Sequence, residues 1–253
     1  MSSFSIRLGT TRNQQRDRDW NKKHITEIHS SFVFEELLSS HVSRQIERGA
    51  LQFNSHAVVG IELLEASETK TYTQHTFDDT HHQVLIHEFM SETFDYDSYM
   101  MTLDEQEKFR HFATVVRDVL VPLLEVHTFS EKEAISEIIE QGLRQIEMND
   151  YKLVILLNKT PKSNKKRNRI AVFKLIVSVT GTTFWIEVYE KGMRLFQAKV
   201  IEEIASPYAF SLYFGTIRWE SDEVFTIHSK VRNWNARVNV LNGTIDVYKQ
   251  IRD

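Results

Sequence analysis

A cluster of positive charge is the first stretch of this 253-residue chain whose residue types could do chemistry. The run KTPKSNKKRNR spans residues 159–169 and contains no acidic side chain. Its cations are Lys159, Lys162, Lys165, Lys166, Arg167 and Arg169. Each could neutralise a phosphate, and the serine and asparagines between them could donate hydrogen bonds to phosphate oxygens. One interpretation is therefore an RNA- or DNA-binding protein that contacts phosphates through this loop and one sheet face.

The position of the basic run also supports other interpretations. It lies between two apolar runs, 152–158 and 169–179, which read as the arms of a β-hairpin. Lysines keep an exposed hairpin tip solvated and protect sheet edges from aggregation. The same cluster suits docking to an acidic protein partner, or a nuclear-import signal in a eukaryote. The near-neutral pI of 6.3 disfavours a dedicated nucleic-acid binder, because such proteins are usually basic over a whole face.

A second basic and aromatic stretch, KVRNWNARVN, covers residues 230–239. Arg232 and Trp234 alternate with asparagines in it, a composition that suits contact with a polynucleotide or a peptide. It also suits an ordinary strand, because aromatic residues favour strands and mostly fill cores. We take Arg232 and Trp234 as candidate partner-binding residues together with the basic run.

Histidines and aspartates gather in QHTFDDTHHQVLIHEF, residues 74–89. Imidazole and carboxylate groups are zinc and iron ligands, and a hairpin could bring them together. A register that pairs His75 with His87 would place the two rings face to face, and a slip by one would separate them. This region supports a metal-assisted enzyme as a further alternative. The spacing matches no metal motif, so we assign no metal ligand and no cofactor.

An acidic and aromatic segment, EFMSETFDYDSYMMTLDEQE, covers residues 88–107. It is either a connecting loop whose aromatic side chains tuck against the core or a docking surface for a basic partner. The basic ends of the chain could also dock there, within one molecule or between copies. Self-association is therefore an expectation beside a separate protein partner.

The remaining composition excludes several classes of site. The chain has no cysteine, so disulfides, thiolate metal sites and cysteine nucleophiles are ruled out. It contains no P-loop, no GxGxxG and no GxSxG motif. No signal peptide and no apolar run long enough to span a bilayer is found, so we expect no membrane association. We expect a soluble intracellular protein, cytoplasmic or nuclear.

The elements that must position these residues indicate an α+β fold. We predict a disordered basic tail over 1–18 and a single α+β domain over 19–253. A sub-boundary near residue 150 could divide it into a helical and mixed half, 19–150, and an antiparallel β half, 151–253. Apolar periodicity predicts a helix from about residue 21 to 48, ended by Gly49 in a left-handed cap.

Alternating strand patterns over 56–65, 69–77 and 84–90 predict a small antiparallel meander. Two central helices follow. The first begins at a capping box in TLDE and should end or kink at Pro122, and the second begins at a capping box in SEKE. From Tyr151 onward, short strands separated by turn signals, among them Asn242-Gly243, predict a long antiparallel sheet.

The sequence as a whole favours a non-enzymatic protein that binds other macromolecules, as a subunit or scaffold of a protein assembly. The partner surfaces we expect are the basic loop 159–169 and the acidic aromatic segment 88–107. The charge layout supports this view, because residues 1–23 carry a net charge of +4 and the basic run +6 in a chain of net charge −4. Such asymmetry concerns partners rather than fold.

Overall fold

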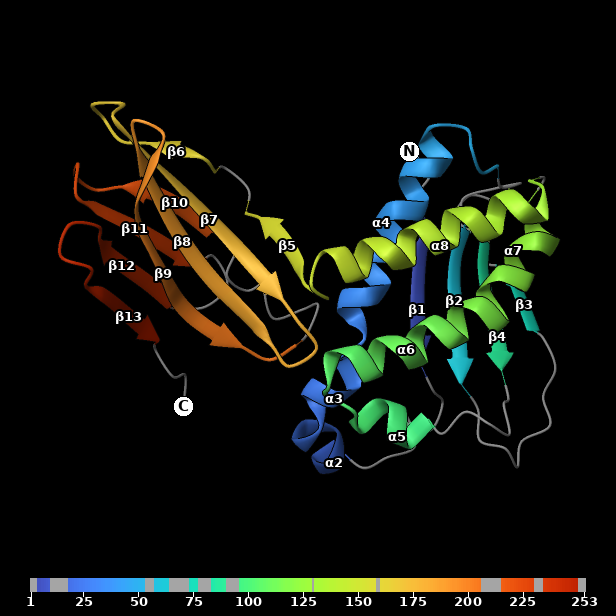
Figure 1. The fold of residues 1–253 in the computed structure, drawn as a ribbon. Coiled ribbons are helices and arrows are strands. Elements are labelled where there is room, and N and C mark those ends of the chain that lie inside the picture. Colours follow the sequence, from blue (N-terminus) through green and yellow to red (C-terminus); the bar gives the residue numbers. More distant parts are fainter. Residues whose placement is uncertain are drawn as a thin grey trace. The chain divides into compact units, whose positions relative to one another are not determined.

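The computed structural model describes residues 4–9, 18–52, 57–63, 73–76, 83–89, 96–128, 130–157, 160–205, 215–229 and 234–249. The chain divides into two compact units, Met1–Lys152 and Leu153–Asp253, with their boundary close to the sub-boundary that we placed near residue 150. Figure 1 shows helices and a sheet in the first unit and strands in the second. The α+β class and the C-terminal antiparallel strands are confirmed.

The sheet of the N-terminal unit is mixed rather than an antiparallel meander, so that prediction was wrong. Its four strands are β1 (Ser5–Gly9), β2 (Ala57–Leu63), β3 (Thr73–Thr76) and β4 (Gln83–Phe89), in the order β1-β2-β4-β3. The β1–β2 and β2–β4 pairs are parallel, and only β3 and β4 pair antiparallel. Alternation of apolar residues predicts a strand but carries no information about the direction of its neighbour.

Residues 4–9 are ordered, although they lie within the tail that we predicted to be disordered. Strand β1 lies at the edge of the sheet, and the side chains of Phe4 and Ile6 are buried. The backbone N–H of Ile6 donates to Ser39 Oγ at 2.9 Å, and that of Phe4 donates to Ser43 Oγ at 3.3 Å. Two helical serines thus satisfy backbone donors beside the open edge of β1. The alternation of apolar residues in β1 is short and lies in a polar, arginine-rich stretch, so the sequence did not indicate this strand.

The helical segments between β1 and β2 make the crossover that parallel pairing requires. They are α2 (Arg18–Lys23), α3 (Ile25–His29) and α4 (Phe32–Glu47). Helix α4 packs against β1 and against the last helix of the unit. Gly49 has a φ of +76°, so it forms the left-handed cap that the sequence predicted.

The helices after β4 are α5 (Tyr96–Met101), α6 (Glu105–Val115), the π-helical turn η1 (Val116–Leu120), α7 (Val121–His127) and α8 (Lys132–Met148). The helical path continues through Pro122, because the wider π turn before it accommodates the missing donor. Asp104 caps α6 by accepting from the Glu107 N–H at 2.8 Å. The predicted apolar stripe of α8, from Ile135 to Ile146, is buried. No helix in the described ranges combines the length and the apolar character that crossing a bilayer requires.

The C-terminal unit contains two antiparallel sheets. The first sheet has the order β5-β7-β8-β9, with the short β6 also paired to β7, and its strands are β5 (Leu153–Leu156), β6 (Lys162–Ser163), β7 (Arg169–Val177), β8 (Thr182–Glu190) and β9 (Met193–Glu203). The second sheet has the order β10-β11-β12-β13, with strands β10 (Gly215–Trp219), β11 (Val224–Ser229), β12 (Trp234–Asn239) and β13 (Ile245–Lys249). Each sheet is built mainly from neighbours in sequence, as in a meander.

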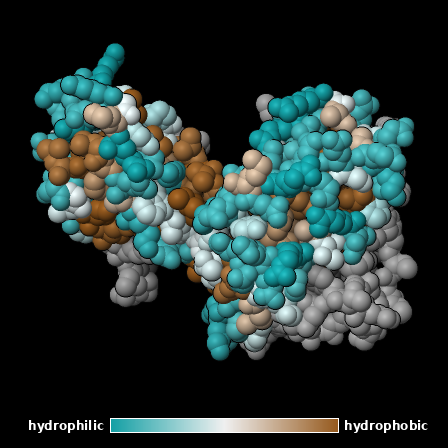
Figure 2. All heavy atoms as spheres, viewed as in Figure 1, coloured by the Kyte–Doolittle hydropathy of each residue, from teal (hydrophilic) through white to brown (hydrophobic). Residues whose placement is uncertain are grey.

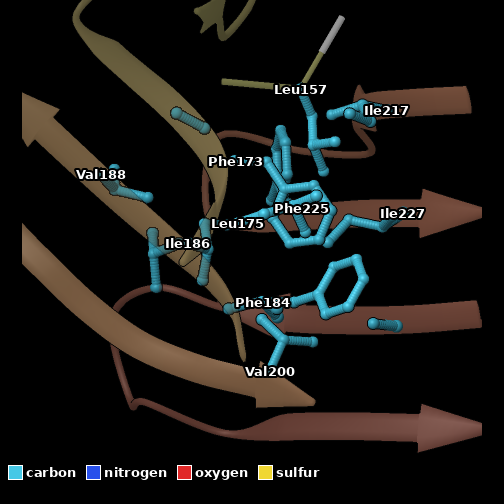
Figure 3. Packing of buried hydrophobic residues seen from close by; sticks show 14 of the residues in the cluster. Leu157, Phe173, Leu175, Phe184, Ile186, Val188, Val200, Ile217, Phe225 and Ile227 are labelled. Atoms are coloured by element: carbon cyan, nitrogen blue, oxygen red, sulfur yellow. The ribbon is translucent and has the colours of Figure 1, made fainter. Parts of the chain in front are cut away.

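The two sheets share one apolar core, which makes the unit a β-sandwich. Figure 3 shows Phe173, Leu175 and Phe184 of the first sheet packed against Phe225 and Ile227 of the second. Along β7 the buried positions alternate strictly, so every second side chain points into this core. The intervening positions of the same strand form the outer face of the first sheet.

Candidate functional site

The basic run forms an ordered turn rather than a loose hairpin tip. Strand β5 pairs with β7 as the hairpin prediction required, and Lys162 and Ser163 of β6 pair with Ala171 and Ile170. The centre of the turn is Asn164, whose side chain is 3% exposed. Its Oδ1 accepts from the backbone N–H groups of residues 168 and 169, each at 3.1 Å. These bonds fix the backbone that carries the lysines and arginines.

An acidic turn of the second sheet, residues 220–223, binds the basic turn. Asn164 Nδ2 donates to Asp222 Oδ1 at 3.0 Å, and Lys166 Nζ lies 2.9 Å from Asp222 Oδ2. Arg169 Nη1 donates to the backbone oxygen of Asp222 at 2.7 Å. The hydrogen bond from Lys166 lowers the pKa of the Asp222 carboxyl. We call this arrangement the turn clasp; it ties the two sheets together at one end of the sandwich.

The turn clasp and a neighbouring carboxylate neutralise part of the predicted phosphate-binding charge. Arg169 Nε also lies 3.3 Å from Glu190 Oε1. In the described part of the chain, Lys162, Lys165 and Arg167 form no ion pair. Lys159 lies outside the described residues. The structure therefore leaves three of the six predicted cations available for a partner. Two others, Lys166 and Arg169, are bound within the chain.

The two candidates from the 230–239 stretch have different outcomes. Arg232 lies outside the described residues. Trp234 is 2% exposed and belongs to the sandwich core, so its ring offers no stacking surface and the prediction for it was wrong. The alternation along β12 places Trp234, Ala236 and Val238 inward. Trp234 thus fills the core, as aromatic residues of strands mostly do.

The outer face of the second sheet is polar. It carries Arg218, His228, Asn235 and Arg237, which sequence analysis had not brought together. His228 Nδ1 lies 2.6 Å from Asn235 Oδ1, and Arg237 Nε donates to Glu220 at 3.1 Å. A polar outer face is the normal condition of an antiparallel sheet that buries its other face.

The outer face of the first sheet is largely apolar over β5, β7 and β8 and polar over β9, and sequence analysis missed the apolar part. Its apolar side chains are Val154, Leu156, Ile170, Val172, Ile176, Trp185 and Tyr189, from β5, β7 and β8. Val154 is 55% exposed and Leu156 60%. Apolar surface interrupts the hydrophilic surface of the β-sandwich in Figure 2. The signal was present in IAVFKLIV, because an apolar run without alternation is typical of a strand covered on both faces.

An ionic cluster centred on the buried carboxylate of Glu187 lies where this apolar surface meets β9. Lys174 Nζ donates to Glu187 Oε1 at 2.6 Å, and the Tyr189 hydroxyl donates to Glu187 Oε2 at 2.8 Å. Arg194 lies 3.9 Å from the same carboxylate. Burial raises the pKa of Glu187, but the hydrogen bonds from Lys174 and Tyr189 outweigh it, so the pKa is lowered overall. The carboxylate is thus charged, desolvated and held in one orientation.

The acidic aromatic segment is partly core. Tyr99 and Met100 are buried, so these two side chains do not belong to a docking surface. The carbonyl oxygens of residues 99, 100 and 102 accept hydrogen bonds from Lys108 Nζ at 2.8, 3.0 and 3.1 Å. Lys108 is fully buried and closes the C-terminal end of α5. Residues 90–95 lie outside the described part of the chain.

The histidine-rich segment does not form the register that would favour a metal site. His75 pairs with Val84, three positions from His87. His81 and His82 lie outside the described residues.

The chain matches no family model, no curated protein and no solved structure. Its function must therefore be inferred from its own surfaces.

Proposed function

We propose that this protein is a non-enzymatic subunit of a larger protein assembly and binds its protein partner through the outer face of the first sheet. The observation that supports the proposal is the largely apolar composition of that face over β5, β7 and β8, whereas the outer face of the other sheet is polar. Single exposed apolar residues are ordinary, whereas a contiguous apolar patch marks an interaction site. The basic loop, which we had expected to be a partner surface, becomes secondary to this face.

Covering this face with a partner would be favourable, because it removes apolar surface from water and adds little desolvation cost. Transfer of exposed apolar surface out of water contributes about 25 cal/mol per Å², and Val154, Leu156 and Ile170 supply such surface. The charges of the ionic cluster would add little penalty, since Glu187 is already desolvated and hydrogen bonded. A fixed ionic cluster at the border of an apolar surface also favours one partner orientation over others.

Site-directed photo-crosslinking in the full-length chain tests the proposal. A photoreactive residue at Leu156 is expected to crosslink in the source cells to one discrete protein, because Leu156 lies on the apolar face. The matched control is the same residue at Thr216, which is exposed on the second sheet. Leu156→Glu should abolish co-purification of the crosslinked protein without changing Tm. Equal crosslinking from both positions, or none from Leu156, would contradict the proposal.

Nucleic-acid binding is a second candidate, carried by the three cations that remain outside the turn clasp. We expect weak binding that falls with salt with a slope of about −2.7 in log K against log[salt], the value for three phosphate contacts on duplex DNA. Changing Lys162, Lys165 and Arg167 to serine should remove the binding, whereas Lys191→Ser, in the exposed β8–β9 turn, should not. Titration of duplex DNA at several salt concentrations measures this. A slope of about −4.5, the value for five contacts, would mean that Lys166 and Arg169 leave their carboxylates to bind phosphate.

A further inference from the structure

Within the described residues of the C-terminal unit, strand β5 is an unpaired edge of the first sheet. In the part of the chain that the structure describes, β5 pairs only with β7. Its sequence LVIL contains no charge, no proline and no glycine. Natural proteins usually protect such edges with charges, bulges or a covering segment. An apolar edge of this kind is a site for pairing with another strand.

The opposite edge of this sheet, strand β9, is protected. Strand β9 carries Arg194, Lys199 and Glu202, and its pairing with β8 has two register irregularities. The β6 part of the β5 edge is covered, because Trp219 Nε1 donates to the backbone oxygen of Lys162 at 2.9 Å. Among the described residues of this sheet, the four residues of β5 keep an apolar edge.

The backbone geometry of β5 shows which groups face outward along the sheet. The N–H of Leu157 donates to the Phe173 oxygen of β7 at 3.0 Å. The direction of hydrogen bonding alternates along an antiparallel strand. The N–H and C=O groups of Ile155 therefore point toward β7, and those of Val154 and Leu156 point toward the open edge. The side chains beside these edge groups are the two most exposed ones of the strand.

We infer that β5 pairs antiparallel with β5 of a second copy of this chain, about a two-fold axis through Ile155. In this register Val154 lies opposite Leu156 of the partner copy, and Leu153 lies opposite its Leu157. Both pairs are apolar, and Val154 and Leu156 supply the outward N–H and C=O groups that the new ladder needs. The inference goes beyond the proposed function, because strand pairing occupies the edge and leaves the apolar outer face uncovered for the proposed protein partner.

The symmetry favours a second copy over an unrelated strand. A two-fold axis perpendicular to the sheet keeps outer face beside outer face, whereas a shift by one residue would place an outer face beside an inner one. No like charges meet in the register, because Lys152 does not oppose the same residue of the other copy. Pairing extends the apolar face across the axis, with Val154 and Leu156 of both copies at its centre. The contact is short, so we expect a weak dimer with Kd above about 1 µM.

A charge-pair experiment on the full-length chain tests both the partner and the register. Sedimentation of the wild type from 1 to 500 µM should show a monomer–dimer equilibrium. The variant Val154→Lys/Leu156→Lys places like charges opposite each other and should be monomeric at all these concentrations. The variant Val154→Glu/Leu156→Lys places opposite charges there and should dimerise again, less strongly at high salt. Unchanged Tm values for all variants show that the sandwich itself remains folded.

The possible results separate this inference from the proposed function. A wild type that stays monomeric at 500 µM overturns the second copy, and so does a lysine variant that dimerises like the wild type. In either case, a Leu156 crosslink to a different protein keeps the proposed function. A monomer whose Leu156 crosslinks only within its own chain overturns both.

Discussion

Replacing Asn164 with leucine is expected to lower the free energy of unfolding by about 3 kcal/mol, even though the residue lies in a turn. The side chain makes two accepted and two donated hydrogen bonds while almost fully buried. A typical intramolecular hydrogen bond contributes about 1 kcal/mol, and a polar group left buried without a partner costs more. Leucine has a similar size, so the loss would come from these bonds rather than from a cavity.

Urea denaturation of the full-length chain measures this effect, with Lys165→Ser as the matched control. Lys165 lies next to Asn164 and is exposed, so its replacement should change the free energy of unfolding by less than about 0.5 kcal/mol. Asn164→Leu should also release Lys166 and Arg169 from the turn clasp and thereby strengthen phosphate binding. A loss of stability below about 1 kcal/mol would show that the basic run is a solvated tip and that the turn clasp contributes little.

Replacing Lys108 with methionine is expected to destabilise the N-terminal unit by about 2–3 kcal/mol at neutral pH. Three carbonyl oxygens at the end of α5 lose their donor, and each buried unsatisfied group costs roughly 1–3 kcal/mol. Removal of a desolvated ammonium offsets part of this cost. Lys191→Met, at an exposed turn, is the matched control and should have little effect.

The pH dependence gives a second measurement on Lys108. Burial lowers its pKa to about 7, well below the usual value of about 10.4. Between these values the unfolded chain binds more protons than the folded chain, so the stability due to Lys108 rises as pH rises from about 7 toward 10. The difference in stability between wild type and Lys108→Met should therefore be larger at pH 9 than at pH 7. A difference independent of pH would contradict the lowered pKa.

The sequence predicted the local elements well where one residue pattern decides the structure. The apolar stripe of α8, the left-handed cap at Gly49 and the β5–β7 hairpin around the basic run are all present. Each depends on contacts between residues close in sequence or on the conformational preference of one residue. The helix starts were less accurate: Asp104 caps α6, and the hydroxyl of Ser130 accepts from Gln52 instead of capping α8.

The candidate site was predicted only in part, because charge in a sequence does not show which charges meet. The sequence shows the basic run directly. Its pairing with Asp222 joins segments 53 to 58 residues apart, and local pattern does not predict such a contact. Trp234 was assigned to a surface because the composition around it is polar, and its place in the core follows from the packing of two sheets. Long-range packing decided both outcomes.

By itself, the sequence determined the class of the fold, the strand-rich C-terminal half and the place of strongest positive charge. Only the tertiary structure decided that the N-terminal sheet is largely parallel, that two of the six cations of the basic run serve the turn clasp, and that the outer face of one sheet is largely apolar over β5, β7 and β8. The physical reason is that strand direction and sheet stacking are set by contacts between distant segments. The single pattern IAVFKLIV indicated a strand covered on both faces. Which segment or partner provides the second cover is a question of tertiary or quaternary packing.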